Sequence, residues 1–445
     1  MLKFLLAICT YFSFGGLGMA NTEHPNILII FTDDQRRDTI AALGNDYIDT
    51  PTMDTLAQSG LVFNNIYCLG GNEPAVCQPS RRMLLTGDPW FVNNPQRNMA
   101  KHFEENGYET YFVGKTSNAA QDQWEQFQHQ KRLGHARDQE FPGRSLVDTA
   151  IEYLDHNANE AEGRPFLMYL AGPAPHDPYL GPEEFFEKYR TREIPMPPDY
   201  LPEHPFDNGE MNVRYEHHFP PPRSEETIRQ VLQEYYAVID QLDTELARLL
   251  AELVSRGLWE NTIIVFTSDQ GISLGSHGLI AKQSLYESTM GVPFIIVGPG
   301  IEPGQTDALG YLFDVFPTIA ELAGIPVPEG IHGRSLAPVI GNPSSDHRED
   351  ILLAYTKADG THVQRAVRRD NWKYFYYPHN GIEQLFNLAD DPHEMNNLSE
   401  DPDLQDKKRE MQQIMRQMQE DLEDPYHLPA EPGGTAVIVG GEADE

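Results

Sequence analysis

Cysteine, basic residues and long hydrophobic runs are all scarce in this sequence of 445 residues. Of the three cysteines, only Cys68 and Cys77 lie beyond the first twenty positions. Two cysteines are too few for a disulfide framework, but one disulfide between them is possible. The 33 lysines and arginines are outnumbered by 68 aspartates and glutamates, so the formal net charge is −35. That charge repels phosphate backbones and anionic lipids, which excludes nucleic-acid binding as a main role.

Beyond the N-terminus, no stretch approaches the run of about 20 apolar residues that a membrane-spanning helix needs. Residues 1–20 have the form of a secretory signal peptide, because Lys3 precedes an apolar segment and Gly18-Met19-Ala20 forms a small-x-small cleavage site. The apolar segment is short and interrupted by Gly15 and Gly16, which disfavours a membrane anchor. We therefore predict an exported protein, secreted or periplasmic, without stable membrane insertion.

Short apolar runs alternate with helical patterns from about residue 25 to about residue 325, which is typical of an α/β domain with a mostly parallel sheet. After Ser224, apolar residues three and four positions apart predict a long amphipathic helix. Between Tyr189 and Arg223 the chain is rich in proline, which indicates either a plain loop or the wall of a cleft. The clearest strands are expected at Asn26–Phe31, Tyr111–Val113, Phe166–Leu170, Thr262–Thr267 and Phe294–Val297.

The pattern changes past about residue 345. Alternation over Asn371–Tyr377 predicts antiparallel strands, and Leu404–Leu422 predicts a charged terminal helix. The last fifteen residues contain two glycine pairs and are expected to form a loose tail. We therefore divide the chain into a signal peptide (1–20), a catalytic domain (21–340), a C-terminal α+β subdomain (341–430) and a flexible tail (431–445).

Polar residues follow several of the predicted strands. In an open α/β sheet, ligands bind beyond the carboxyl ends of the strands. One aspartate after a strand is usually a turn or a helix cap, but the segments NILIIFTDDQ and NTIIVFTSDQ repeat the same arrangement. Carboxylate and amide oxygens converging in this way suit Ca²⁺ or Mg²⁺. The candidates are Asp33 and Asp34 after the first strand and Asp269 and Gln270 after the Thr262–Thr267 strand, with Lys115 and His176 delivered by two other strands.

The segment Cys77-Gln78-Pro79-Ser80-Arg81 carries the strongest chemical signal. A thiolate at the start of a helix beside an arginine is expected to be activated. A soft sulfur, however, is a poor partner for a site made of oxygen ligands. The mismatch would disappear if the cysteine were converted to an oxygen-bearing residue.

This segment, followed by Leu85-Thr86-Gly87, resembles the signature of the type I sulfatases, in which the cysteine is oxidised after translation to Cα-formylglycine. The resemblance includes secreted bacterial carbohydrate sulfatases and iduronate-2-sulfatase-like members. It implies an alkaline-phosphatase-like α/β fold, with a large, mostly parallel sheet flanked by helices and a smaller C-terminal antiparallel sheet with a terminal helix. Matching motifs elsewhere are Thr32-Asp33-Asp34-Gln35, Gly114-Lys115, Pro175-His176-Asp177-Pro178, Ser268-Asp269-Gln270-Gly271, Gly275-Ser276-His277-Gly278, Lys282 and Leu385-Phe386-Asn387-Leu388.

The resemblance implies a sulfuric-ester hydrolase that removes sulfate from a sulfated carbohydrate. Cys77, converted by a formylglycine-generating maturation enzyme, would be the nucleophile. One Ca²⁺ would be held by the matured Cys77 together with Asp33, Asp34, Asp269 and Gln270. Arg81 would steady the nucleophile, Lys115 and Lys282 would bind sulfate oxygens, and His176 would protonate the leaving alcohol or orient the ester. Candidate substrate contacts are His277 and, in the proline-rich segment, His204 and Arg214.

Two alternatives stay open. A phosphodiesterase or phosphonate monoester hydrolase on the same fold can also use formylglycine, so Cys77 alone does not separate it from a sulfatase. A sulfated-glycan-binding protein with a decayed site is the other alternative. It is favoured by Asp88, where the family commonly has arginine, and by residues 116–118 after Lys115, where many members carry a histidine. The retained nucleophile argues against it.

Overall fold

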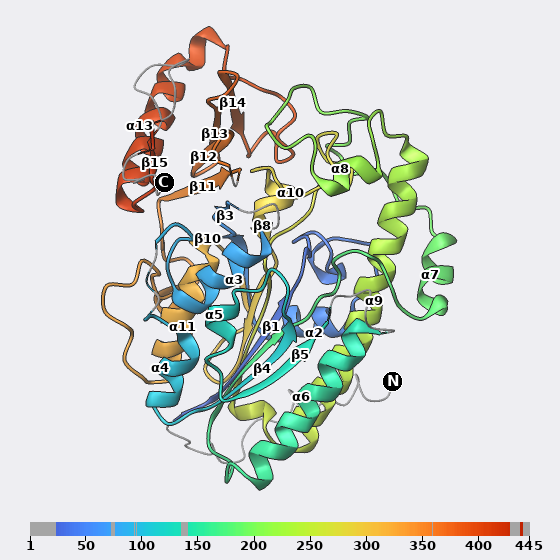
Figure 1. Ribbon diagram of the computed structural model, residues 1–445, viewed down its shortest axis with the longest axis vertical. Helices are drawn as coiled ribbons and strands as arrows, with labels where there is room; N and C mark the ends of the chain where they lie inside the picture. The colour runs from blue at the N-terminus through green and yellow to red at the C-terminus, as the bar shows by residue number, and fades with distance from the viewer. Residues whose placement is uncertain are drawn as a thin grey trace.

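Two β-sheets of different size organise the chain (Figure 1), and β15 (Tyr426–His427) and β16 (Val437–Ile438) form a separate two-stranded pair. The computed structural model describes residues 24–72, 76–92, 94, 96–134, 141–357, 359–427 and 437–438. The predicted signal peptide and most of the predicted tail lie outside the described residues. Among the described residues, no helix combines the length and the apolar character needed to span a bilayer.

The larger sheet has nine strands in the order β10-β2-β9-β7-β1-β6-β4-β5, with β8 paired to β2. The pairs that join β1 to β6 and β7, and β4 to β5 and β6, are parallel, whereas β9 runs antiparallel to β7 and β2. The sheet is therefore mostly parallel, as predicted. Its strands are β1 (Asn26–Thr32), β2 (Leu61–Tyr67), β4 (Glu109–Lys115), β5 (His129–Leu133), β6 (Phe166–Ala171), β7 (Thr262–Ser268), β8 (Gly291–Val292), β9 (Phe294–Val297) and β10 (Gly304–Tyr311).

The two central strands carry the repeated sequence segments, and their register aligns the repeats. Asn26 pairs with Thr262, and Thr32 pairs with Ser268. All seven residues of both strands are buried, as expected for a parallel sheet covered on both faces. Because the strands run in parallel and in register, Asp33 and Asp269 leave the sheet side by side.

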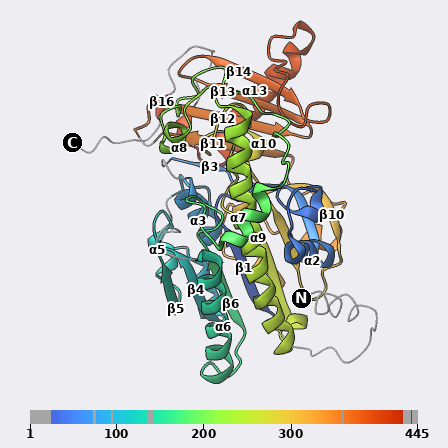
Figure 2. The ribbon, with the colours of Figure 1, turned by 90° about the vertical axis from the view of Figure 1, so that its right-hand side faces the viewer.

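Helices cover both faces of this sheet (Figures 1 and 2). On one face, α2 (Pro51–Ser59), α6 (Pro142–Asn159) and α7 (Glu183–Arg190) pack against the long helix α9 (Glu225–Ser255). The predicted helix after Ser224 is α9, and the Ser224 hydroxyl caps it by accepting from the Thr227 amide. The opposite face is covered by α3 (Cys77–Thr86), α4 (Met99–Glu105) and α11 (Val315–Leu322).

The smaller sheet has the order β14-β13-β12-β11-β3 and is antiparallel except for the β11–β3 pair. Its first strand, β3 (Gly70–Gly71), lies just before α3 in the sequence, so this sheet adjoins the segment that leads to Cys77. The terminal helix packs on the sheet, and both share one hydrophobic core with the α3 face of the large sheet. The remaining strands of this sheet are β11 (Asp350–Thr356), β12 (Val363–Arg369), β13 (Trp372–Tyr377) and β14 (Ile382–Asn387), and the terminal helix is α13 (Gln405–Asp421).

Candidate active site

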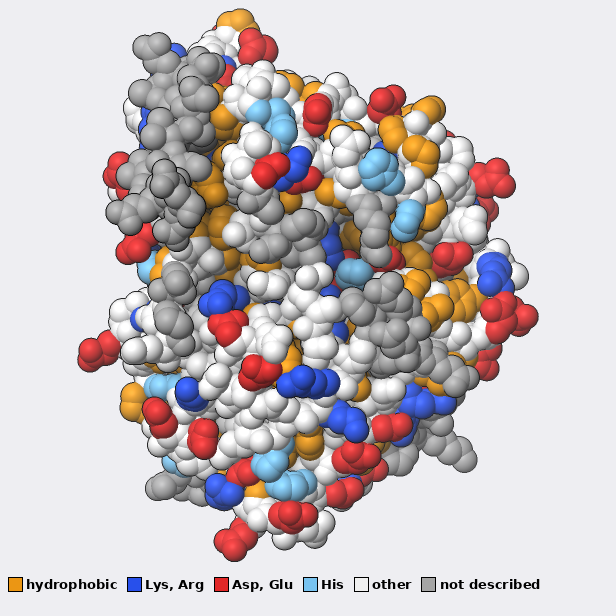
Figure 3. All heavy atoms as spheres, in the orientation of Figure 1, with side chains coloured by type: hydrophobic (Ala, Val, Ile, Leu, Met, Phe, Trp, Pro, Cys, Tyr) orange, Lys and Arg blue, Asp and Glu red, His pale blue; other side chains and the backbone are white. Residues whose placement is uncertain are grey.

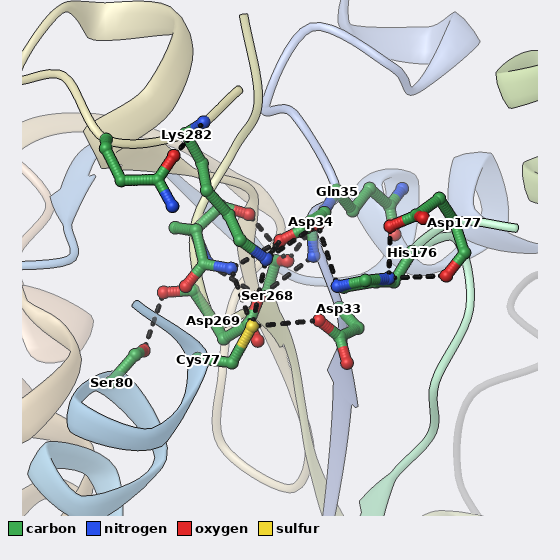
Figure 4. A network of polar contacts seen from close by, with 12 residues as sticks. Asp33, Asp34, Gln35, Cys77, Ser80, His176, Asp177, Ser268, Asp269 and Lys282 are labelled. Carbon is green, nitrogen blue, oxygen red and sulfur yellow. Dashed lines mark hydrogen bonds and ion pairs between the residues drawn. The ribbon is translucent and has the colours of Figure 1, made fainter. Parts of the chain in front are cut away.

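The carboxyl ends of β1, β6 and β7 meet the first turn of α3 at one edge of the large sheet (Figure 4), and β4 lies next to β6 in the same sheet. Cys77 is the first residue of α3, and its thiol is fully buried. Its Sγ lies 3.0 Å from Lys282 Nζ, 3.3 Å from Asp33 Oδ1 and 3.3 Å from Gln270 Nε2. The structure thus brings the predicted nucleophile together with residues from three distant parts of the chain.

Three carboxylates surround this thiol. Single ligand atoms of Asp33, Asp34, Asp269 and Cys77 all lie within 4.8 Å of one another, so the group can hold a metal ion. Asp34 has a left-handed backbone with φ of 66°, a conformation that non-glycine residues adopt mainly at constrained, often functional, positions.

Gln270 adds an amide to the carboxylates. Its Nε2 contacts Asp34 Oδ1, and its Oε1 is buried without a hydrogen-bond partner. The oxygen and nitrogen of an amide exchange places by a simple flip, which would turn the oxygen toward the carboxylates and give it a cation to bind. Together with the three carboxylates this donor set fits a hard divalent cation.

Three cations balance the carboxylates. Lys282 Nζ lies 2.6 and 2.8 Å from the two Asp34 oxygens. Lys115, the last residue of β4, forms an ion pair with Asp33. Arg81 lies 3.1 Å from Asp33 Oδ2 and 3.5 Å from Asp269 Oδ2. Each lysine therefore pairs with a different carboxylate, while Arg81 bridges Asp33 and Asp269.

Burial and neighbouring charges set the protonation of the acidic groups. Burial alone would raise the pKa of Asp33, but Lys115 and Arg81 outweigh it and hold that pKa well below its usual range. For Asp269, burial and then repulsion from Asp33 raise the pKa to about 7. Burial and the neighbouring Asp33 carboxylate therefore disfavour a negative charge on Asp269, and a cation bound between the carboxylates would offset this.

The same environment acts against a thiolate at Cys77. Burial raises the pKa of the thiol, and the nearby Asp269 and Asp33 carboxylates raise it further. The expected activation by the helix N-terminus and Arg81 is therefore wrong, because burial and two carboxylates dominate. Cys68 and Cys77 are both free, so the bridge that the sequence left open is not formed.

His176 approaches the carboxylates from the loop after β6. Its Nδ1 lies 2.6 Å from the Asp177 carbonyl oxygen and 2.8 Å from Asp177 Oδ1, so this nitrogen carries a proton and donates. Its Nε2 lies 3.7 Å from Asp34 Oδ2, and the ring is 23% exposed. Sequence reasoning gave Asp177 no role, although its place directly after the histidine is a signal for an orienting partner.

Two of the predicted substrate residues, His277 and His204, contact each other and the loop that follows β7. His277 stacks on Tyr286 with ring centroids 3.6 Å apart, and His204 Nδ1 bonds the His277 carbonyl oxygen at 2.7 Å. Both rings are buried and brace the loop that follows β7. Their contact with substrate stays a prediction. Arg214 is the first residue of α8 (Arg214–His218), and its side chain lies outside the described part of the structure.

Asp88, which seemed at odds with the family pattern, has partners of its own. It is buried, pairs with Arg97, and accepts from the ring and the backbone amide of His332. The carboxylate thus forms a buried ion pair of its own at the position where the family commonly has arginine.

A family model described as Sulfatase matches residues 25–325, more than half of the chain. The chain belongs to the sulfatase family. A second model, described as N-sulphoglucosamine sulphohydrolase, C-terminal, matches residues 275–421 of this sulfatase. Family membership over this length makes the protein a sulfuric-ester hydrolase, as predicted.

Relatives align with nearly all of this sulfatase. It is 27% identical to the N-acetylglucosamine-6-O-sulfatase of Bacteroides thetaiotaomicron, covering 91% of this chain and 88% of that one. A solved structure with its substrate D-glucosamine-2-N,6-O-disulfate has a TM-score of 0.76 at 23% identity, covering 90% of this chain and 98% of that one. A phosphonate monoester hydrolase of Agrobacterium radiobacter has a TM-score of 0.75 at 20% identity, covering 89% and 96%. These likenesses confirm the predicted fold.

Proposed function

We propose that this sulfatase is an exported enzyme that removes sulfate from a sulfated carbohydrate, with Ca²⁺ bound and Cys77 matured to formylglycine. The observation that carries the proposal is the convergence of three carboxylates and three cationic side chains around Cys77. Figure 4 shows the carboxylates and Lys282. The sugar substrate is supported by relatives whose names specify sulfated sugars. Export is supported by the form of residues 1–20.

The state of Cys77 supports its conversion. Its raised pKa keeps the unmodified thiol protonated at neutral pH, and a soft sulfur matches poorly with the carboxylates around it. When present, formylglycine supplies an oxygen nucleophile and Ca²⁺ supplies Lewis-acid stabilisation of charge. Asp33, Asp34, Asp269 and Gln270 would hold the cation.

The cationic residues recognise the sulfate group. Lys282 and Lys115 each bring an ammonium group to the carboxylates at Cys77, where sulfate oxygens would be bound. Such fixed positive groups favour the charge that develops on the transferring group. Arg81, fully buried between Asp33 and Asp269, holds the carboxylates and the first turn of α3 in place.

His176 is placed to serve the leaving alcohol. Its Nδ1–H is fixed by Asp177, so Nε2 is the nitrogen that faces the site. In the imidazolium form, Nε2–H would donate its proton to the ester oxygen as the bond to sulfur breaks. This single histidine would act where many members of the family have two.

The binding of an anionic ester requires local positive charge on a protein with a net charge of −35. Figure 3 shows acidic side chains spread over the face and, near its middle, a small hollow where basic, histidine and acidic side chains meet. With a divalent cation bound beside Lys115, Lys282 and Arg81, the site would carry the local positive charge that attracts an anion despite the global field, with an association rate that falls as salt is added.

The experiment combines maturation and turnover. Protein exported by its native host is digested, and the mass of the Cys77 peptide is measured beside that of a Cys77→Ala control. Both proteins are then assayed for sulfate release from sulfated mono- and oligosaccharides and from aryl sulfates, and for hydrolysis of phosphonate monoesters and phosphodiesters. We expect a formylglycine mass and sulfate release that the control lacks.

Other results would assign another function. Hydrolysis of phosphonate monoesters or phosphodiesters without sulfate release would favour the phosphohydrolase. An unmodified thiol, with binding of sulfated glycans but no turnover, would favour the non-catalytic reading.

A further inference from the structure

Lys282 lies on a loop whose two arms are hydrogen-bonded to each other. It follows β7 and leads into α10 (Glu287–Met290), and residues 271–286 are buried throughout. Its two arms bond each other, because the amides of Ser273, Leu274 and Gly275 donate to the carbonyls of Ala281, Ile280 and Leu279. Lys282 follows directly after these arms, so its Cα position depends on where the loop is held.

A buried glutamate from another segment holds this loop. One carboxylate oxygen of Glu216, in α8, accepts from the backbone amides of Ile280 and Ala281, each at 2.9 Å. The other oxygen pairs with Arg223, and the side chains of both residues are almost fully buried. Arg223 also donates to the carbonyl oxygen of Gly278, at the tip of the loop. The pair therefore grips the loop at its tip and at the two residues that precede Lys282.

The other side of Lys282 is fixed as well. The Gln283 carbonyl oxygen accepts from Gln364 Nε2, in β12, at 3.1 Å. At the tip, Gly278 has φ of 71°, and a side chain there would collide with the backbone of Glu203 and His204. The proline-rich segment that contains Glu203 thus runs against the loop backbone to backbone.

We propose that Glu216, together with Arg223, is a positioning residue that places the Lys282 ammonium beside Asp34 and residue 77. Lysine has a long flexible side chain, so its charged end is located only if its backbone is held. A buried carboxylate that accepts two amide hydrogens is a strong, directional anchor. The inference rests on the proposed role of Lys282 in binding the sulfate group.

A double-mutant cycle tests the proposal. Removal of a charge-stabilising donor typically lowers activity by about 10²–10³-fold, the loss expected for Lys282→Ala in kcat/KM for a sulfate ester. A shift of about 1 Å can lower the rate by about 10²-fold, so Glu216→Ala is expected to approach that loss. In the Lys282→Ala background, the loss from Glu216→Ala should nearly vanish, because there is no ammonium left to misplace. Glu216→Gln, whose amide oxygen can still accept both amides, should restore most of the activity.

A matched control separates positioning from stability. The Arg365–Asp424 pair is equally buried but lies in the smaller sheet and the segment after α13. Within the described part of the chain, neither side chain bonds to the loop residues 271–286. Asp424→Ala should lower Tm while leaving kcat/KM below Tm unchanged in both backgrounds. An equal loss from Glu216→Ala with and without Lys282 would overturn the proposal.

If the alanine variant does not fold, Glu216→Asp can be used instead, because it keeps the negative charge that pairs with Arg223. Its side chain is one methylene shorter, so the loop that it anchors must shift. A crystal structure of this variant shows the position of the Lys282 ammonium directly, and this measurement does not depend on the proposed function. We expect Lys282 Nζ to leave Asp34; an ammonium that stays in place would overturn the proposal whatever the activity. Full activity of Lys282→Ala would instead count against the role of Lys282 in the proposed function.

Discussion

His176 reaches the site through one ring nitrogen while Asp177 occupies the other. If Nε2–H protonates the leaving alcohol, the requirement for it depends on how poor the leaving group is. His176→Gln is expected to lower kcat/KM by about 10²–10⁴-fold for a sugar sulfate, the usual contribution of a general acid. The loss should be far smaller for 4-nitrophenyl sulfate, whose phenolate leaves without a proton. Equal losses on both esters would refute acid catalysis and leave an orienting role.

Asp33 is kept ionised by Lys115 and Arg81, and it is one of the residues that can hold a cation. Asp33→Asn keeps the shape but removes the charge, so we expect Ca²⁺ affinity to fall by at least about tenfold. The measurement is the rise in Tm with added Ca²⁺, which reports binding without turnover. Asp88→Asn, at a buried aspartate outside the group, is the control. If Ca²⁺ raises the Tm of Asp33→Asn as it does that of wild type, the proposed ligand set is wrong.

For single residues, the sequence predicts which side chains belong to the site better than it predicts which of them pair with each other. Motifs on six segments identified Cys77, the three aspartates, both lysines and His176, and the structure brings these together. That Lys115 pairs with Asp33 while Lys282 pairs with Asp34 could not be predicted. Such pairings depend on side-chain geometry across strands and loops that are distant in sequence. The anchor at Glu216 was missed because its partners are backbone amides, which leave no pattern in a sequence.

Helices α2 and α9 are joined by one buried carboxylate. Asp243, in α9, accepts from the amides of Thr52 and Met53 in the first turn of α2, at 2.8 to 3.1 Å. Burial raises the pKa of Asp243 to about 7, and these hydrogen bonds only partly oppose the rise. From about pH 4 to about pH 7, the folded protein therefore retains a proton that the unfolded chain has released.

A pKa that is higher in the folded state means that stability falls as the pH rises through that window. Asp243→Asn keeps an acceptor for the amides and cannot ionise. We therefore expect wild type to lose stability relative to this variant between about pH 4 and about pH 7, with a constant difference above it. Urea unfolding at a series of pH values measures this difference. A difference that does not change with pH would show that burial does not dominate at Asp243.

Sequence patterns identified elements with clear periodicity and missed those without it. The runs at β1, β6, β7 and β9 and the stripe of α9 were predicted within one or two residues at each end. Strand β10 was not, because it contains Gly304, Asp307 and Gly310, residue types that are depleted in strands. It forms because β2 offers it a parallel partner, which is tertiary context.

The two sheets act as one body through both apolar and charged contacts. The smaller sheet, α13 and the α3 face of the large sheet lie in one hydrophobic core. At their junction, the Glu287 carboxylate at the start of α10 pairs with Lys373 of β13 and accepts a hydrogen bond from the Tyr67 hydroxyl of β2. Glu394 pairs with the same lysine and accepts from the Glu287 amide. Helix α10 also contacts the site, because the Thr289 carbonyl oxygen accepts from the amide of Gly271, next to Gln270. Through α10, residues of both sheets therefore support the site.

Lys373→Met tests this junction. The substitution keeps the side-chain volume but leaves Glu394 without its cation, while Glu287 retains Arg37 at 2.8 Å. Breaking a buried pair in this way typically destabilises by about 3–5 kcal/mol. Arg409→Met removes an exposed pair on α13 and should change stability by no more than about 1 kcal/mol. Urea unfolding followed by fluorescence and by circular dichroism should still give one coincident transition for Lys373→Met, because the shared core couples the sheets. Two separate transitions would instead show that this charged junction, and not the core, makes the two sheets a single cooperative unit.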